Sequence, residues 1–352
     1  MTDAAIALLR RLIATPSLSR QEEATADILA DWLSERGIRA ERNDNNVWAR
    51  SRNWRPDRPT VLLNSHHDTV KAAAGYTRDP HAADLEDGKL YGLGSNDAGG
   101  ALVSLLATFV RWENDPTLAV NLVLAATAEE EISGPNGIAA LLPVLPPIDC
   151  GIVGEPTLMD LAVAERGLVV IDGEAKGQSG HAARKEGINA LYLALDDIAA
   201  IRDHAFIRPS ALLGPTSAAV TVIAAGTQHN VVPDRCTFTV DLRVNEAYTN
   251  GEAVAELRSA CCHATLTPRS LRLQSSGIPD DHFLLQAARR ALPLAKAYGS
   301  PTLSDQALMP FPTLKLGPGD SARSHTADEF IWVREIEEGI DGYSRLLATL
   351  AS

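Results

Sequence analysis

Carboxylates and histidines recur at points where apolar runs of this sequence end. The stretch NLVLAATAEEEISGPNG, residues 121–137, is apolar until Glu129, Glu130 and Glu131 follow one another directly before a turn. An acidic run of this kind is usually only a solvated loop. The outer ends of strands in an open α/β sheet are also where active sites are built, and clustered carboxylates there favour a bound cation. The triplet alone leaves both interpretations open.

Other histidines and carboxylates also stand near the ends of apolar runs or beside predicted turns. His66 and Asp68 in NSHHDTV end one apolar run, and Glu155 in GIVGEPT ends another. Asp97 precedes a predicted helix, and His325 follows a glycine-rich loop in KLGPGDSARSHTADEF. Each has an ordinary structural explanation, such as a helix cap for Asp97. A histidine that binds metal often donates its second ring N–H to a carboxylate, which makes His66 and Asp68 a candidate pair. Their joint occurrence indicates a metal site.

The elements that must position these residues alternate along the first part of the chain. Helical spacing of apolar residues predicts a helix over residues 5–13, and Ser19 with Glu22 predicts a capping box for a second helix that ends at Gly37. A strand in TVLLNSHHDTV, a helix in ALVSLLATFVRW and a strand in NLVLAATA follow. This alternation predicts an α/β fold with a mixed, mainly parallel sheet flanked by helices.

The pattern changes in the middle of the chain. Between residues 168 and 275 we predict the order strand, helix, strand, strand, helix, strand, which is typical of an α+β ferredoxin-like module. Helical and apolar segments then resume. We therefore expect a catalytic domain formed by residues 1–167 and 276–352, with residues 168–275 as an inserted domain.

Length and composition limit the classes of protein. A chain of 352 residues is long enough for two domains. A formal net charge of −13 argues against a nucleic-acid partner, which needs a basic face. No apolar run reaches the ~18 residues of a membrane span, and the amino terminus lacks the features of a signal peptide. We therefore predict a cytoplasmic protein without a membrane or nucleic-acid partner.

The cysteines do not indicate a metal site. Cys150, Cys236, Cys261 and Cys262 lack the paired spacing of structural zinc sites, and the adjacent pair cannot readily form a disulfide. We expect reduced, mostly buried thiols.

The motifs SHHD, GLGSND, ATAEEE, GEPT, GQSGH, DLRV and SHTADE occur in this order over nearly the whole chain. The set resembles the acetylornithine deacetylase and succinyl-diaminopimelate desuccinylase family of two-metal amidohydrolases. The resemblance implies a zinc-peptidase-like catalytic domain with an inserted ferredoxin-like lid. NSHHDTV together with GSNDAGG looks like the branch tied to arginine biosynthesis through N-acylated ornithine or citrulline.

The resemblance also implies a set of metal ligands. His66 and Glu155 would bind one metal, Glu131 and His325 would bind the other, and Asp97 would bridge both. Three carboxylates and two imidazoles suit Zn²⁺, and also Co²⁺ or Mn²⁺. A shared carboxylate holds two cations about 3.5–4 Å apart, where they activate water and polarise a carbonyl. We expect two divalent metal ions, most readily zinc.

By the same resemblance, Glu130 would be the general base, Asp68 would orient His66, and Glu129 would not need to contact metal. A glutamate beside the metals can take a proton from water and return it to the departing amine. His181 in GQSGH would stabilise the tetrahedral oxyanion, often from the lid of a partner subunit. We therefore expect a homodimer that forms through the lid.

Substrate contacts follow from the same resemblance. Arg243 and Asn230 would fix the carboxylate of the substrate, since Arg has forked donors for it. Gly317 and Gly319 would bring backbone N–H groups to the same end. His67 and His229 are interpreted as local hydrogen-bonding residues.

The predicted activity is metal-dependent removal of an acetyl or succinyl group from an N-acylated amino acid, acyl-ornithine or acyl-citrulline first. A di- or tripeptidase or a carboxypeptidase on the same scaffold is the nearest alternative, because both reactions hydrolyse an amide next to a carboxylate. A binding protein without catalysis is a third reading, but it would be expected to lack a ligand or the Glu130 base, and this sequence has both.

Overall fold

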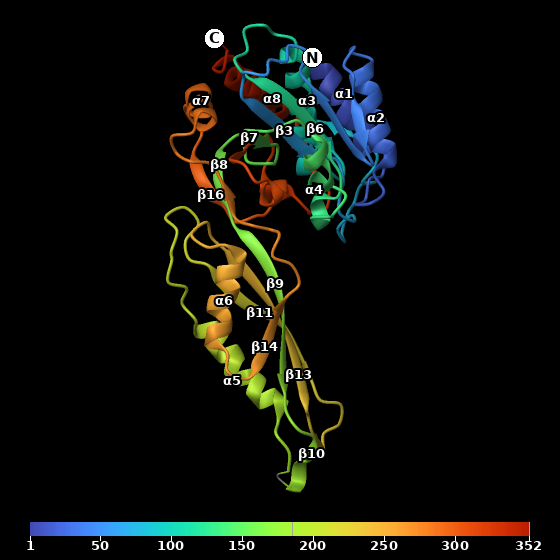
Figure 1. The fold of residues 1–352 in the computed structure, drawn as a ribbon. Coiled ribbons are helices and arrows are strands. Elements are labelled where there is room, and N and C mark those ends of the chain that lie inside the picture. Colours follow the sequence, from blue (N-terminus) through green and yellow to red (C-terminus); the bar gives the residue numbers. More distant parts are fainter. Residues whose placement is uncertain (185, 352) are drawn as a thin grey trace. The chain divides into compact units, whose positions relative to one another are not determined.

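The computed structural model describes residues 1–184 and 186–351 (Figure 1). The chain forms two compact units. The first contains Met1–Val163, Gly277–Tyr298 and Ser304–Ser352, and the second contains Ala164–Ser276 and Gly299–Leu303. The inserted domain predicted at residues 168–275 has boundaries within four residues of the main segment of the second unit, which also includes Gly299–Leu303.

The first unit is built on the main sheet. Its strands lie in the order β1 (Glu41–Asn43), β2 (Asn46–Arg50), β6 (Asn121–Thr127), β3 (Thr60–His66), β7 (Cys150–Val153), β17 (Thr313–Lys315), β8 (Leu161–Glu165) and β15 (Ser276–Gly277), and β16 (Ala297–Ser300) also pairs with β8. The central neighbours β6, β3, β7 and β17 run parallel, whereas β1, β2 and β8 pair antiparallel. The predicted mixed, mainly parallel α/β sheet is confirmed.

Both faces of this sheet are covered, because successive side chains of a strand point to opposite faces. Val61 and Leu63 of β3 join one core cluster, while Leu62 joins another. The helices of the unit are α1 (Thr2–Ile13), α2 (Glu23–Ser34), α3 (Gly100–Trp112), α4 (Ile138–Leu141), α7 (Phe283–Ala291) and α8 (Val333–Ala348). All residues of β3 and β6 are buried, as expected for central parallel strands.

One local prediction is wrong. Helix α2 has Glu22 as its N-cap and no side-chain capping bond. The hydroxyl of Ser19 instead donates to Asp68 Oδ2 at 2.7 Å. A tertiary contact with a carboxylate has replaced the expected capping box.

The second unit consists of β9 (Gly167–Lys176), α5 (Ala190–Asp203), β11 (Ser217–Ala225), β13 (Arg235–Val244), α6 (Asn250–Ala260) and β14 (Ala264–Pro268). Its sheet has the antiparallel order β11, β13, β9, β14, and α5 and α6 pack on one face (Figure 1). This order is typical of a ferredoxin-like module. A short ribbon of β10 (Gly180–His181) and β12 (Val231–Val232) extends from it.

A small sheet of β18 (Phe330–Trp332), β5 (Lys89–Tyr91) and β4 (Leu85–Glu86) completes the first unit. Within the described residues, no helix has both the length and the apolar character to cross a membrane.

Candidate active site

The candidate residues of the first unit gather at one edge of the main sheet. Strand β3 ends at His66, β6 ends at Thr127 just before the acidic triplet, and β7 ends two residues before Glu155. These strands are parallel neighbours, so their carboxyl ends meet at the same edge. His66 and Thr127 are direct partners in the β3–β6 register.

His66 is the centre of one group of possible ligands. Its Nε2 lies 3.4 Å from Asp97 Oδ1, 3.7 Å from Glu155 Oε1 and 4.0 Å from Glu130 Oε2. The His66 Nδ1–H donates to the backbone carbonyl of Asp68 at 3.0 Å. This bond leaves the lone pair of Nε2 directed at the carboxylates when the ring is neutral.

His325 forms the second group. Its Nε2 lies 3.0 Å from Glu131 Oε2 and 3.5 Å from Asp97 Oδ2. The two oxygens of Asp97 therefore approach different imidazoles. The structure brings together all five residues predicted as ligands, with Asp97 in the middle.

The acidic triplet separates its three side chains by a sharp turn. Glu129 has a left-handed φ of 54°, and its carboxylate accepts from both the backbone N–H and the side-chain amide of Asn136. Glu130 and Glu131 donate their backbone N–H groups to Asp68, at 3.0 and 3.2 Å. Glu129 is thus used within the turn, while Glu130 and Glu131 face the imidazoles.

The site has more buried carboxylates than compensating positive charge. Burial raises the pKa of Glu155 to about 8, partly offset by His66, and burial also raises the pKa of Glu130 well above its usual range. Burial alone would lower the pKa of His66, but the nearby carboxylates of Asp68 and Asp97 raise it well above its usual value. Glu131 raises the pKa of His325 to about 9. A bound cation would relieve this repulsion among the carboxylates.

The donor atoms fit a divalent metal. His66 Nε2 is buried and has no hydrogen-bond partner within the described residues, although an unsatisfied buried nitrogen is costly. Two sets of ligand atoms, from His66, Asp97 and Glu131 and from His66, Glu130 and Glu155, each lie within 4.8 Å of one another. Mixed carboxylate and imidazole sets suit Zn²⁺, Co²⁺ and Mn²⁺.

Sequence reasoning missed two buried carboxylates beside these residues. Glu329 accepts from the backbone N–H groups of Gly94, Asn96 and Asp97, and burial raises its pKa to about 7. Asp305 accepts from the Thr127 hydroxyl at 2.7 Å, and burial raises its pKa to about 6. Glu329 is the last residue of the SHTADE motif but was given no role, whereas Asp305 carries no local signal in the sequence.

The N–H of Gly317 has a partner within the chain, whereas the contact predicted for Gly319 stays a prediction. The Gly317 N–H donates to Thr157 Oγ1 at 3.1 Å, so it is not free to bind a substrate carboxylate. A Cβ at Gly317 would lie 2.5 Å from the Glu155 carbonyl, and one at Gly319 would lie 2.6 Å from Asn96 Oδ1. These glycines allow close packing behind Glu155 and Asn96.

His67 has local partners, as predicted. Its Nδ1 pairs with Thr25 Oγ1 at 2.9 Å, and its Nε2 donates to the Asn45 carbonyl at 3.0 Å. Burial lowers the pKa of His67 to about 4, so the ring is neutral and links α2 to the end of β3.

The remaining candidates belong to the second unit. His181 and Asn230 lie together on the β10–β12 ribbon, where the Ala182 N–H donates to the Asn230 carbonyl at 3.1 Å. His181 Nδ1 accepts from the Ala183 N–H at 3.2 Å. Arg243 forms a two-point ion pair with Asp241, at 2.7 and 3.0 Å. Their roles toward the metal ligands stay predictions.

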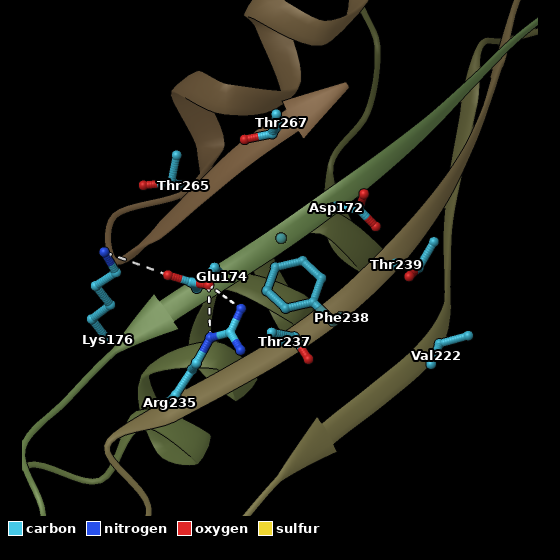
Figure 2. Close-up of a pocket in the computed structure, with 11 residues that line it drawn as sticks. Asp172, Glu174, Lys176, Val222, Arg235, Thr237, Phe238, Thr239, Thr265 and Thr267 are labelled. Atoms are coloured by element: carbon cyan, nitrogen blue, oxygen red, sulfur yellow. Dashed lines mark hydrogen bonds and ion pairs between the residues drawn. The ribbon is translucent and has the colours of Figure 1, made fainter. Parts of the chain in front are cut away.

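The second unit also has a cavity of about 500 Å³ on its sheet, distinct from these candidates (Figure 2). Threonines line it together with Glu174, which is paired with Arg235 and Lys176. Since its charges are paired with one another, the cavity gives no argument for a charged ligand.

The chain is similar to known proteins in sequence and in structure. Residues 62–349 match the model of Peptidase family M20/M25/M40. An acetylornithine deacetylase of Shigella sonnei is 32% identical over an alignment of 372 residues, which covers 94% of each chain.

Solved structures share the fold. The aminopeptidase PepT of Bacillus cereus superposes with a TM-score of 0.82 at 18% identity, covering 100% of this chain and 99% of that one. A dinuclear metal-binding peptidase of the M20 family from Bacillus subtilis gives a TM-score of 0.74 at 18% identity, covering 98% and 97%.

Proposed function

The chain belongs to Peptidase family M20/M25/M40, and from this premise we propose that it is a two-metal hydrolase of N-acylated amino acids. The observation that carries the proposal is the position of Asp97. One of its oxygens lies 3.4 Å from His66 and the other 3.5 Å from His325. A carboxylate so placed can bridge two cations.

The reaction needs one water and no other reactant. The water oxygen adds to the amide carbon, the C–N bond breaks, and the products are a carboxylate and a free amine. When bound, the metal ions supply Lewis acidity to the carbonyl and the water.

Glu130 moves the proton. Its Oε2 lies 4.0 Å from His66 Nε2, next to the point where the ligand atoms converge. Glu130 takes the proton of the attacking water and returns it to the leaving nitrogen. Asp68 holds the Glu130 backbone in place, and His181 is proposed to stabilise the oxyanion.

The substrate class is N-acetyl- or N-succinyl-ornithine or -citrulline, in arginine biosynthesis. The identity of 32% to an acetylornithine deacetylase over 94% of the chain supports it. A peptidase activity is the alternative, favoured by the resemblance to PepT.

The proposal includes a cytoplasmic homodimer formed through the second unit. Strand β11 is an edge of its sheet, and Val222 and Ile223 on it are 57% and 46% exposed. An edge strand with exposed apolar side chains is suited to pairing with another copy. The four free cysteines agree with a reducing compartment.

Release of free amine tests the function. The zinc-loaded protein is assayed against N-acetyl- and N-succinyl-ornithine, -citrulline and -lysine, and against matched di- and tripeptides, with Glu130→Gln as the inactive control. We expect the highest kcat/KM on an acyl-ornithine or acyl-citrulline. Higher values on peptides would favour the peptidase, and no amine from any substrate would refute the proposal.

A further inference from the structure

Asp305 lies outside every motif used above, yet it contacts the sheet edge that carries the site. It begins a short 3₁₀ helix, Asp305–Leu308, and is 4% exposed. Its Oδ2 accepts from the hydroxyl of Thr127 at 2.7 Å. Met309, directly after the helix, is buried in a core cluster with Leu62 and Val123 of the main sheet. Asp305 is therefore held on the same rigid sheet as Thr127.

The hydrogen bonds give the Thr127 hydroxyl a fixed direction. Thr127 Oγ1 accepts from Asn64 Nδ2 at 3.0 Å. Its own single proton can then go to Asp305 at 2.7 Å or to the Ser65 carbonyl at 3.3 Å. The shorter contact is with a carboxylate, and charge-assisted bonds are the stronger ones. The buried network thus runs from Asn64 through Thr127 to Asp305.

Thr127 is the residue through which this network reaches the site. It is the direct register partner of His66, and Glu130 follows three positions later. The turn between them is fixed on its other side by Asp68, which accepts from the Glu130 and Glu131 N–H groups. The Thr127 backbone is also held in the β3–β6 ladder, where its carbonyl accepts from the His67 N–H at 2.9 Å, so the hydroxyl adds a side-chain restraint at the base of the acidic turn.

We propose that Asp305 is a positioning residue which, through the Thr127 hydroxyl, fixes the acidic turn that carries Glu130 and Glu131 relative to His66. The inference rests on the proposed function for its catalytic consequence. Asp305 acts here as a hydrogen-bond acceptor, and no proton is transferred to or from it.

The test compares variants that remove the bond with variants that keep it. Thr127→Val keeps the shape of the side chain but loses the hydroxyl, and Asp305→Ala removes the acceptor. Thr127→Ser keeps the hydroxyl, and Asp305→Asn keeps an acceptor oxygen. Zinc affinity is measured by competition with a chelator, and kcat and KM are measured on the best substrate.

We expect Thr127→Val and Asp305→Ala each to lower zinc affinity and kcat by about 10–100-fold, the usual effect of losing a residue that orients a metal ligand. KM should change little, and the double variant should be no worse than either single one. Thr127→Ser and Asp305→Asn should stay near the wild type. The control is Asp149→Ala, because Asp149 accepts from the Thr60 N–H at 2.7 Å at the opposite end of β3. This change should lower thermal stability only.

Wild-type zinc affinity and kcat in Thr127→Val would overturn the inference. So would equal losses in Asp305→Asn and Asp305→Ala, which would indicate that the charge matters rather than the bond. A separate result concerns the function. If the variants lose zinc affinity as expected but the wild type releases no amine from any substrate, the positioning role stands and the proposed function fails.

Discussion

The backbone N–H of Glu130 donates to Asp68 Oδ1 at 3.0 Å. The second oxygen of Asp68 accepts from the Glu131 N–H at 3.2 Å and from the Ser19 hydroxyl at 2.7 Å. The backbone carbonyl of the same residue accepts from His66 Nδ1. Asp68 thereby connects the histidine at the end of β3 with the acidic turn after β6.

Replacing Asp68 should therefore disturb both strand ends. In Asp68→Asn one acceptor oxygen becomes an NH₂ donor that faces a backbone N–H. We expect kcat to fall by about 10–100-fold, as for other residues that orient metal ligands. Ser19→Ala is the matched control, because it removes one donor and leaves both backbone bonds; its loss should be smaller. Equal kcat values for Asp68→Asn and the wild type would show that the acidic turn keeps its conformation without these bonds to Asp68.

The architecture could be predicted from the sequence because strands that are buried on both faces are continuous apolar runs. NLVLAAT became β6, and TVLLNSH became β3. The failure at Ser19 has a physical reason: a local capping rule competes with a carboxylate brought close by folding. Hydrogen bonds to charged groups are the stronger alternative.

The ligands were readable for a related reason. His66 and Glu131 stand at or just after the ends of parallel strands, so their sequence positions already place them at one edge. Asp305 begins a short 3₁₀ helix that is distant in sequence from these strand ends, and nothing local in the sequence indicates that it approaches the site. The use of the Gly317 N–H by Thr157 was hidden for the same reason.

Metal removal should abolish activity and destabilise the first unit. Glu130 and Glu155 are only 11% and 13% exposed and offer ligand atoms within 4.8 Å of one another, and a cation bound only by the folded state stabilises it. We expect the melting temperature to fall on chelation and to rise with the concentration of added Zn²⁺ or Co²⁺. Thermal scans at several metal concentrations measure this, with Glu131→Gln showing a smaller rise. An active protein without bound transition metal would contradict the metal site.

His181 should contribute to the transition state. The Ala183 N–H donates to its Nδ1, so the neutral ring carries its proton on Nε2, where it can donate to an oxyanion. His181→Ala should lower kcat by about 10²–10³-fold, the range for loss of an oxyanion donor. His229→Ala, at an exposed neighbouring position, is the control and should retain kcat. Unchanged kcat in His181→Ala would leave His181 a surface residue.

Subunit mixing tests which chain His181 serves. Hybrids of His181→Ala with a metal-site variant should regain activity if the residue acts across a dimer. No recovery after proven subunit exchange would place its action within one chain.

Acid should lower the stability of the second unit, because it protonates the carboxylate of Glu252. The backbone N–H of Thr249, and then Arg208, lower the pKa of Glu252 to about 2 from its usual 4.5. A carboxyl whose folded pKa is depressed contributes stability above its unfolded pKa and loses it as pH falls. The contribution should therefore disappear between about pH 4.5 and 2. Urea unfolding at several pH values measures the free energy of unfolding. Below pH 4.5 this free energy should fall less steeply for Glu252→Gln than for the wild type. Glu338→Gln, which changes an exposed carboxylate on α8, should behave as the wild type.

The three neighbouring glutamates should respond differently to the same change. Glu130→Gln keeps the size of the side chain but removes the base, so metal should stay bound while kcat falls by roughly 10²–10⁴-fold. Glu131→Gln removes an anionic group 3.0 Å from His325 Nε2, so metal content and activity should fall together. Glu129→Gln alters the contacts with Asn136 and with Arg20, whose Nε lies 3.9 Å from Glu129 Oε1, and neither partner is a predicted metal ligand. Metal content should therefore be retained and activity reduced modestly, with some loss of thermal stability.

Metal content per chain, measured beside kcat for all three variants, decides the assignment. The turn directs Glu129 to Asn136 and Glu131 to His325, so a difference between these two variants has a structural cause. If Glu129→Gln loses metal while Glu131→Gln keeps it, the roles are displaced by one residue. Loss of metal in Glu130→Gln would make Glu130 a ligand, which its 4.0 Å distance from His66 Nε2 allows, and another group would have to carry the proton.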